Sequence, residues 1–560
     1  MDEPVDGSAV GALVVVPSFA RESVVPFRRL RALAVRAADA GYVVLSVFLG
    51  GDGESSSIPE SADLVAEWGL EVDAAVAAAV ASVPRLPVSV VGWRLGAALT
   101  YRHLGLAAAS DTSQRGHGEG GGSRDGAAPL ASGTPITGRA LLWEPVSGAS
   151  FVRQHQHLRR FASPVKAVEG GVEFVGAYLS DAQVASLRGL KAPKGAAGTE
   201  AFSILREPDP KSLLQLTLGS PHFVHIDMAA IDAVVASLDR GESAPFLPVP
   251  ERLTATWDEA GCRISESIVE VGPYRLSGVL TRSVDTPATR GVLFTAIGSE
   301  LRSGPGGTWS ESARDIARDG VMSLRVDRRT LGEDTDVSEA REPYPYTDES
   351  VEDVLEAAEY VAAQVQDDIL GVGACSGAWS VLRGSAKGRF GSILAVNPVH
   401  WDPDARNYDD DFYERTYRSE GMFSQVLASA GASGAEDGNG AEGADDDAAT
   451  RRWQVGIHAL LHRLAIRFPR LRGFVRGDRS TDRVGALLRL LGPKAHAILA
   501  MGPGEEAIFR AKGGNAYLAR SLRSDLIEVR VSEHIDHSLF SLRSRQVVQS
   551  LIRDIVQRQP

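Results

Sequence analysis

A cysteine at the centre of a turn made of small residues is the first candidate for chemistry in this sequence. The apolar run that begins at Ile369 breaks into Gly373-Ala-Cys-Ser-Gly377. Read as a strand, a tight turn and a helix, this spacing places Cys375 at the turn, with nearly side-chain-free residues two positions before and two after it. A register centred on Ser376 fits less well, because glycines flank Cys375 on both sides. The simplest alternative is a buried structural cysteine in a glycine-containing turn.

A carboxylate and a histidine follow this turn in an order that supports nucleophilic catalysis. Glu505 comes just after a predicted strand at Ala497–Met501, and His537 just after a predicted last strand at Leu526–Val531. A thiol attacks as the thiolate, so it needs a base, and the base needs a group that orients it. Nucleophile, acid and histidine occur in this order in α/β hydrolases, where the turn is called the nucleophile elbow. We therefore predict that Cys375, Glu505 and His537 form a catalytic triad.

Neighbouring residues leave alternatives for the acid and the base. Glu506 stands beside the predicted acid, and His534 also follows the last predicted strand. The preference for His537 rests on the Asp-His-Ser-Leu-Phe segment around it. For the oxyanion hole we predict the backbone N–H of Ser376 and one N–H from the loop that contains Ile297.

The same elbow spacing occurs once more, earlier in the chain and with a different central residue. Gly92-Trp-Arg-Leu-Gly96 follows a predicted strand at Val88–Val91 and precedes a helix, so Arg94 occupies the position of the nucleophile. A guanidinium group stays protonated and cannot attack a carbonyl carbon. Arg94 is therefore a candidate for binding a carboxylate or phosphate, and the alternative is a structural ion pair with an acidic residue.

Composition and charge narrow the class of protein. The chain has 560 residues, of which 44% are hydrophobic, a length that predicts two to four domains. A formal net charge of −13 argues against general binding of nucleic acid or of anionic membranes, which need clustered Lys and Arg. The two cysteines, Cys262 and Cys375, provide no disulfide framework and no Cys-based zinc site, so we expect no metal and no cofactor. With an acidic N-terminus and no apolar run long enough for a membrane span, we expect a cytoplasmic protein.

Alternating strands and helices predict an α/β fold in two tandem domains, each a mostly parallel sheet flanked by helices. The βαβ pattern of the first part ends near a proline-rich stretch and then restarts. We predict a first domain at 1–243, a linker at 244–256 and a second domain at 257–560.

Three further segments have a distinctive composition. Residues 109–134 and 429–450 are rich in small and charged residues and are predicted to be disordered insertions. Residues 451–491 carry many arginines and stand where this fold usually has its lid. The run Gln154-His-Gln-His157 is interpreted as a polar helix surface, because two histidines two positions apart would not share a helix face.

Several segments resemble known families of the α/β-hydrolase superfamily. These families are similar to serine aminopeptidases. In the second half, Gly373-Ala-Cys-Ser-Gly377 and Asp536-His-Ser-Leu-Phe540 resemble segments of the exosortase A system-associated hydrolase 1 family. In the first half, Pro17-Ser-Phe-Ala-Arg-Glu22, Gly92-Trp-Arg-Leu-Gly96 and Leu142-Trp-Glu-Pro-Val146 resemble segments of the companion hydrolase 2 family. Thr295-Ala-Ile-Gly298 departs from the Asn-Ala-Gly type of oxyanion loop expected by this resemblance.

The resemblance implies a fused pair of hydrolase-like domains connected to surface-polysaccharide metabolism, with a small acyl or glycan-linked substrate and a partner protein of that pathway. With the triad, it predicts an esterase or thioesterase, or an acyltransferase if a sugar hydroxyl replaces water. The alternative is a protein of a different class, a non-catalytic binding or scaffold protein built on two hydrolase folds. Arg94 at the first elbow favours this alternative for the first half.

Overall fold

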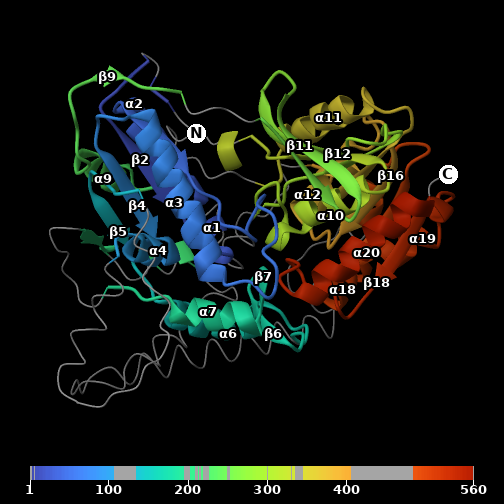
Figure 1. The fold of residues 1–560 in the computed structure, drawn as a ribbon. Helices are drawn as coiled ribbons and strands as arrows, with labels where there is room; N and C mark the ends of the chain where they lie inside the picture. The colour runs from blue at the N-terminus through green and yellow to red at the C-terminus, as the bar shows by residue number, and fades with distance from the viewer. Residues whose placement is uncertain are drawn as a thin grey trace, which may run out of the picture.

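The computed structural model describes residues 3–4, 7–105, 134–193, 202–208, 212–213, 216–217, 226–248, 253–298, 300–329, 331–334, 345–404 and 483–558. We call residues 1–245 the first half and residues 254–560 the second half. The predicted insertions lie outside the described residues, apart from residue 134. Of the predicted lid region, only residues 483–491 are described. Figure 1 shows the two halves side by side, each with its own sheet.

The first half is built on a five-stranded parallel sheet. Its strands lie in the order β3-β2-β4-β5-β8, with bounds β2 Gly11–Val16, β3 Tyr42–Ser46, β4 Val88–Trp93, β5 Ala140–Trp143 and β8 Ser203–Leu205. β2 and β4 are buried along their whole length, which explains their continuous runs of apolar residues.

Helices cover both faces of the first sheet, and a separate two-stranded hairpin packs against two of them, α6 and α7. The helices are α1 Arg21–Val24, α2 Phe27–Asp39, α3 Leu64–Ser82, α4 Leu95–His103, α6 Gly148–Ala162, α7 Asp181–Gly189 and α9 Met228–Ala236. The hairpin consists of β6 Gly171–Phe174 and β7 Ala177–Ser180. Pro26 occupies the N-cap position of α2 and separates this helix from α1. Hydrophobic cores lie on both faces of the sheet.

The second half is built on a nine-stranded sheet in the order β10-β11-β12-β14-β13-β15-β16-β17-β18. The strands are β10 Thr254–Glu259, β11 Cys262–Val271, β12 Leu276–Ser283, β13 Arg290–Phe294, β14 Val321–Val326, β15 Ile369–Ala374, β16 Phe390–Val396, β17 His496–Met501 and β18 Ile527–Val531. The pairs among β10, β11 and β12 and the pair β12–β14 are antiparallel, and all other pairs are parallel. The predicted α/β class, with parallel sheets flanked by helices, is confirmed.

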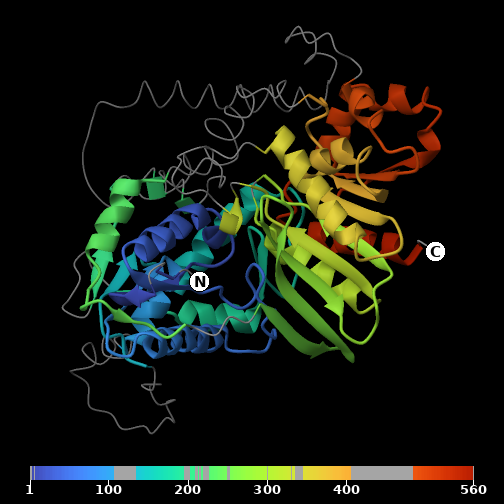
Figure 2. The same ribbon diagram turned by 90° about the horizontal axis from the view of Figure 1, so that it is seen from above.

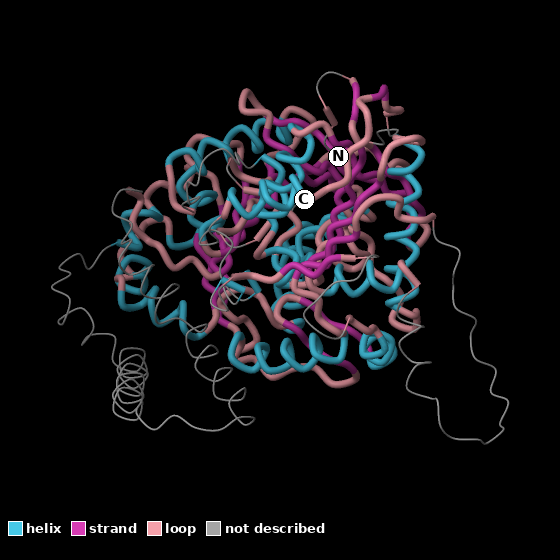
Figure 3. Tube along the Cα trace, turned by 90° about the vertical axis from the view of Figure 1, so that its left-hand side faces the viewer, coloured by secondary structure: helices cyan, strands magenta, loops and turns pink. Residues whose placement is uncertain are grey.

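The helices of the second half also cover both faces of its sheet (Figure 2). They are α10 Thr308–Ala317, α11 Asp348–Ala362, α12 Ser376–Gly384, α17 Arg483–Leu488, α18 Pro503–Ala511, α19 Gly514–Leu518 and α20 Leu542–Arg558. Short 3-10 helices occur at Pro305–Gly307, Gly332–Asp334 and Ser524–Leu526. Figure 3 shows the strands of both sheets inside their helical layers.

The predicted linker at 244–256 is wrong at both of its ends. Ala244–Pro245 forms β9, which pairs with β1, Ser8–Ala9, and so belongs to the first half. At the other end, β10 begins at Thr254 and pairs with β11. Prolines in this stretch suggested an unstructured connection, but edge pairings depend on partners that local sequence does not reveal.

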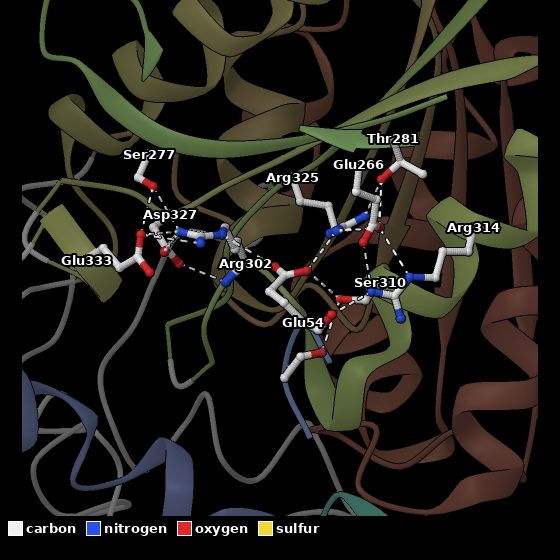
Figure 4. A network of polar contacts seen from close by, with 11 residues as sticks. Glu54, Glu266, Ser277, Thr281, Arg302, Ser310, Arg314, Arg325, Asp327 and Glu333 are labelled. Carbon is white, nitrogen blue, oxygen red and sulfur yellow. Dashed lines mark hydrogen bonds and ion pairs between the residues drawn. The ribbon is translucent and has the colours of Figure 1, made fainter. Parts of the chain in front are cut away.

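The two halves are joined by partly buried ion pairs as well as by packing (Figure 4). Glu54 lies in the loop after β3, and its Oε2 accepts hydrogen bonds from Nη2 of Arg325 at 2.7 Å and from Oγ of Ser310 at 3.0 Å. Nε of Arg302 lies 3.4 Å from the other carboxylate oxygen. Arg325 is fully buried. Because removing one partner of a buried ion pair is costly, this cluster fixes one half against the other.

Candidate active site

The turn between β15 and α12 has the backbone of a nucleophile elbow. Cys375 has φ 50° and ψ −112°, a conformation that residues with a Cβ atom rarely adopt. A Cβ atom built on Gly373 would lie 2.5 Å from the carbonyl oxygen of Gly377, so the strand and the helix approach too closely for a side chain there. Ser376 is already the first residue of α12. The strained position is thus Cys375, as the preferred register predicts.

Polar neighbours surround the sulfur of Cys375. The side chain is only 9% exposed, and the hydroxyl of Tyr346 lies 3.6 Å from Sγ. Burial raises the pKa of the thiol, but hydrogen bonds from His537, from Tyr346 and from the backbone N–H of Ser376 stabilise the thiolate, as does the charge of His537. The net result is a pKa of Cys375 below its usual value. Reactive cysteines have neighbours of this kind, whereas inert buried cysteines lie in apolar surroundings.

The histidine and the acid meet at the loops after β17 and β18. Nδ1 of His537 lies 3.0 Å from Oε1 of Glu505, so Nε2 is the ring nitrogen left for the thiol. Burial raises the pKa of Glu505, but the hydrogen bond and charge of His537 hold that pKa below its usual value. The two competing residues lie elsewhere: Glu506 pairs with Arg510 within α18, and His534 is exposed. The structure therefore brings the three preferred residues together.

A residue that the sequence reading passed over connects the acid loop to the histidine loop. Asn397 follows β16, has φ 47° and is fully buried. Its Nδ2 donates to the carbonyl oxygens of Asp536 and His537 at 2.7 and 3.0 Å, and its Oδ1 accepts from the N–H of Gly502 at 2.9 Å. The signal in the sequence was an asparagine at the end of a buried strand, where a left-handed conformation is tolerated.

The predicted oxyanion loop lies against the start of α12. It follows β13, and Oγ1 of Thr295 donates to the carbonyl oxygen of Val372 at 3.1 Å. A Cβ atom built on Gly298 would lie 3.3 Å from Oγ of Ser376. The N–H groups of Ser376 and of the Ile297 loop are therefore close to the elbow, as an oxyanion hole requires. Their role stays a prediction.

The elbow of the first half has the same backbone but a different occupant. Arg94 has φ 54° and ψ −108° between β4 and α4. Its Nε and Nη2 donate to the two carboxylate oxygens of Glu22 at 3.1 and 2.8 Å, and Nη2 also donates to Oε1 of Gln154 at 2.8 Å. The anion that Arg94 meets is thus a side chain of its own chain. The interpretation as an external anion site is corrected to the alternative, a buried ion pair.

Two further polar side chains contact Glu22, and the sequence did not indicate either contact. Oγ of Ser18 donates to its carboxylate at 2.9 Å, and Nε2 of His155 lies 3.2 Å from it. Burial raises the pKa of Glu22, but Arg94 and His155 outweigh that effect and lower the pKa to about 2. His155 is fully buried, whereas Gln154 and His157 are exposed, so the prediction of a polar helix surface is wrong for His155.

A cavity of about 320 Å³ lies between the two halves. Its walls are mainly apolar, with Phe27 and Phe48 from the first half and Leu301 and Phe540 from the second. Cys375, Glu505 and His537 do not line it. Among the described residues, no group of three His, Cys, Asp or Glu side chains is arranged to hold a metal ion. Within the same residues, every helix is too short or too polar to span a bilayer.

The chain was compared with family models, with curated proteins and with solved structures. No family model matches the chain, and no curated protein matches it either. Similar solved structures include a dienelactone hydrolase from Anabaena variabilis, at 12% identity and a TM-score of 0.31, covering 54% of this chain and 97% of that one. An α/β serine hydrolase without lid from Xanthomonas campestris has 13% identity, a TM-score of 0.29 and coverages of 56% and 97%. The esterase Est22 has 14% identity, a TM-score of 0.31 and coverages of 53% and 81%. At these identities and TM-scores, nothing about the activity of this chain follows from the three proteins.

Proposed function

We propose that this chain is an α/β hydrolase that cleaves an ester or thioester with Cys375 as the nucleophile. The observation that carries the proposal is the connected set of Cys375, His537 and Glu505, in which the thiol has a lowered pKa. A buried structural cysteine would have its pKa raised by burial. We take the first and second halves as two tandem domains, of which the second is catalytic.

The proposed reaction proceeds through a thioester between the enzyme and the acyl group. His537 takes the proton of Cys375, and the thiolate attacks the carbonyl carbon of the substrate. The N–H of Ser376 and one from the Ile297 loop stabilise the oxyanion that forms. When the tetrahedral intermediate collapses, the leaving oxygen or sulfur takes the proton from the imidazolium. Glu505 orients the ring throughout.

Hydrolysis of the thioester completes the cycle. His537 deprotonates a water molecule, which attacks the thioester carbonyl. When the second intermediate collapses, the bond between carbon and Sγ breaks, the imidazolium returns its proton to the Cys375 thiolate, and the carboxylic acid is released. If a sugar hydroxyl takes the place of water, the same steps transfer the acyl group to a glycan. The resemblance of the two halves to the exosortase A system-associated hydrolase families favours a substrate from surface-polysaccharide metabolism and a partner protein of that pathway.

A second candidate function is that of a non-catalytic scaffold. The observation that favours it is the first half, where the elbow position is used by a buried Arg94–Glu22 ion pair and carries no nucleophile. In this alternative the second half would retain its triad without turning over any substrate.

Activity assays combined with thiol labelling test the proposal directly. The purified full chain is assayed on p-nitrophenyl esters and acyl thioesters of increasing chain length, and its alkylation by iodoacetamide is mapped by peptide mass spectrometry. We expect turnover of at least one ester or thioester, and labelling of Cys375 at neutral pH faster than that of Cys262. Absence of turnover, together with Cys375 labelling no faster than Cys262, would favour the scaffold.

A further inference from the structure

The carboxylate next to the candidate base is held partly by the other half of the molecule. Asp536 directly precedes His537 and is 2% exposed. Within its own loop and the following helix, it accepts hydrogen bonds from the N–H groups of Phe540 and Ser541 and from Oγ of Ser544 at 2.8 to 2.9 Å. One more donor comes from the first half.

That donor is the side chain of Ser163, which follows the last residue of α6. Its Oγ donates to Oδ2 of Asp536 at 2.8 Å. Ser163 is itself 5% exposed, and its Oγ accepts a hydrogen bond from the N–H of Val165 at 3.2 Å, which leaves the hydroxyl hydrogen for Asp536. Nη1 of Arg159 donates to the carbonyl oxygen of Ser163 at 3.2 Å, and Arg159 is fixed by an ion pair with Glu173. The hydroxyl thus has one defined orientation.

The far end of the histidine loop also contacts the first half. The N–H of Gly176, in the turn between β6 and β7, donates to the carbonyl oxygen of Phe540 at 3.3 Å. The guanidinium of Arg21 stacks on the ring of Phe540, 5.4 Å from its centre. Arg21 also pairs with Glu300, which lies three residues after Ile297. The segment 536–540, which contains His537, is therefore held at both ends by the first half.

We propose that Ser163 is a positioning residue for His537, so that the first half is a required part of the active site of the second half. This inference rests on the proposed function. The ring of His537 has to keep its contacts with Glu505 and Cys375 at the same time. Removing the Ser163 hydroxyl leaves Asp536 with one donor fewer in a buried place, and a displacement of about 1 Å in a catalytic group can cost roughly 10²-fold in rate.

Three variants of the full chain test this role. Ser163→Ala removes the donor, Ser163→Thr keeps a hydroxyl, and Ser147→Ala serves as the matched control. Ser147 caps the other end of the same helix, where its Oγ accepts from the N–H of Ser150, so Ser147→Ala weakens the helix by loss of a cap. On the best substrate, we expect Ser163→Ala to lower kcat by roughly ten- to a hundredfold with little change in KM. Ser163→Thr should recover most of the activity, and Ser147→Ala should keep it.

A second readout does not depend on turnover. The pH profile of Cys375 alkylation reports the pKa of its thiol, which His537 lowers. We expect this profile to shift to higher pH in Ser163→Ala and to stay in place in Ser147→Ala. If the unsubstituted chain turns over no substrate, the proposed function fails. If it is active, while Ser163→Ala matches it in kcat and in the alkylation profile, Ser163 has no positioning role and the inference is overturned.

Discussion

The two elbows of this molecule have nearly the same backbone and very different chemistry. Arg94 and Cys375 differ by only a few degrees in φ and ψ. In both turns a Cβ atom on the first glycine, Gly92 or Gly373, would lie 2.5 Å from the carbonyl oxygen four residues later. The strained conformation is therefore fixed by the packing of strand on helix. What the turn can do chemically is decided by the residue at its centre and by the partners that residue finds.

The two halves also differ at the residue that follows the next strand along the chain after each elbow. Glu144 follows β5 with φ 48°, and Asn397 follows β16 with φ 47°. The carboxylate of Glu144 accepts hydrogen bonds from the guanidinium of Arg206 and from the N–H of Glu207, both in the first half. Asn397 instead holds the carbonyl oxygen of His537. In the first half these positions serve stability, whereas in the second half they face loops that carry candidate catalytic groups.

The largest expected effect comes from removing the nucleophile of the second elbow. Cys375→Ala should lower kcat by about 10³-fold or more, because no thiolate is left to form the thioester. Initial rates on the best ester or thioester measure this. Cys262→Ala is the matched control, since Cys262 lies at the start of β11 in the same sheet and should be dispensable.

Cys375→Ser sharpens the same test. A hydroxyl has a far higher pKa than a thiol, so a site that stabilises a thiolate should lose most of its rate on this change. A Ser variant as active as the unsubstituted chain would show that the site works equally well with the oxygen nucleophile of serine hydrolases.

The next effect is on stability and concerns the first elbow. Arg94→Ala leaves Glu22 buried without its main cation, which should cost roughly 3–5 kcal/mol of unfolding free energy. At temperatures where the variant is folded, kcat should stay close to that of the unsubstituted chain. Urea unfolding and steady-state kinetics measure the two quantities.

A double variant separates the ion pair from a general loss of packing. Arg94→Met with Glu22→Gln removes both charges at similar volume, and it should be more stable than Arg94→Ala. A loss of kcat in Arg94→Ala at full folding would contradict the separation of roles between the two elbows.

Local pattern was sufficient to predict much of this molecule. The Gly373-Ala-Cys-Ser-Gly377 spacing located the strained turn, and the order of strands located Glu505 and His537, because each of these signals lies within a few residues of an apolar strand. The α/β class followed from alternating strand and helix patterns in the same way.

Contacts between distant segments could not be predicted. Arg94 gave no indication of its partner, since Glu22 lies 72 residues earlier, and Ser163 lies 373 residues before Asp536. His155 looked like a surface residue because its helix neighbours are polar. The linker was misjudged for the same reason, since β9 pairs with a strand at the start of the chain. A single sequence does not show which distant groups pack together.

Lowering the pH should reduce the stability that the Glu22 carboxylate gives to the first half, over a defined pH range. The pKa of Glu22 is lowered from 4.5 to about 2, so the folded state favours its ionised form. Its contribution to stability is therefore fully present above pH 4.5 and is lost as the pH falls through about 2. A shift of this size corresponds to roughly 3 kcal/mol. Urea unfolding from pH 5 to pH 2.5 should show a steeper loss for the unsubstituted chain than for Glu22→Gln. Equal slopes would contradict the lowered pKa.

The smallest expected effect comes from removing the tyrosine hydroxyl that lies beside Cys375 in the second elbow. The ring of Tyr346 packs edge-on against Trp379, with ring centroids 5.5 Å apart, and its centroid lies 4.9 Å from that of His400. The hydroxyl of Tyr346 lies 3.6 Å from Sγ of Cys375. Tyr346→Phe keeps the ring contacts and removes only that group. Because hydrogen bonds to charged groups contribute about 1.5–3 kcal/mol, the thiol pKa should rise by about one unit and alkylation at neutral pH should slow by up to tenfold. Tyr360→Phe, on the partly exposed helix α11, is the control and should leave the profile in place. An unchanged profile in Tyr346→Phe would mean that His537 and the elbow backbone stabilise the thiolate without the tyrosine.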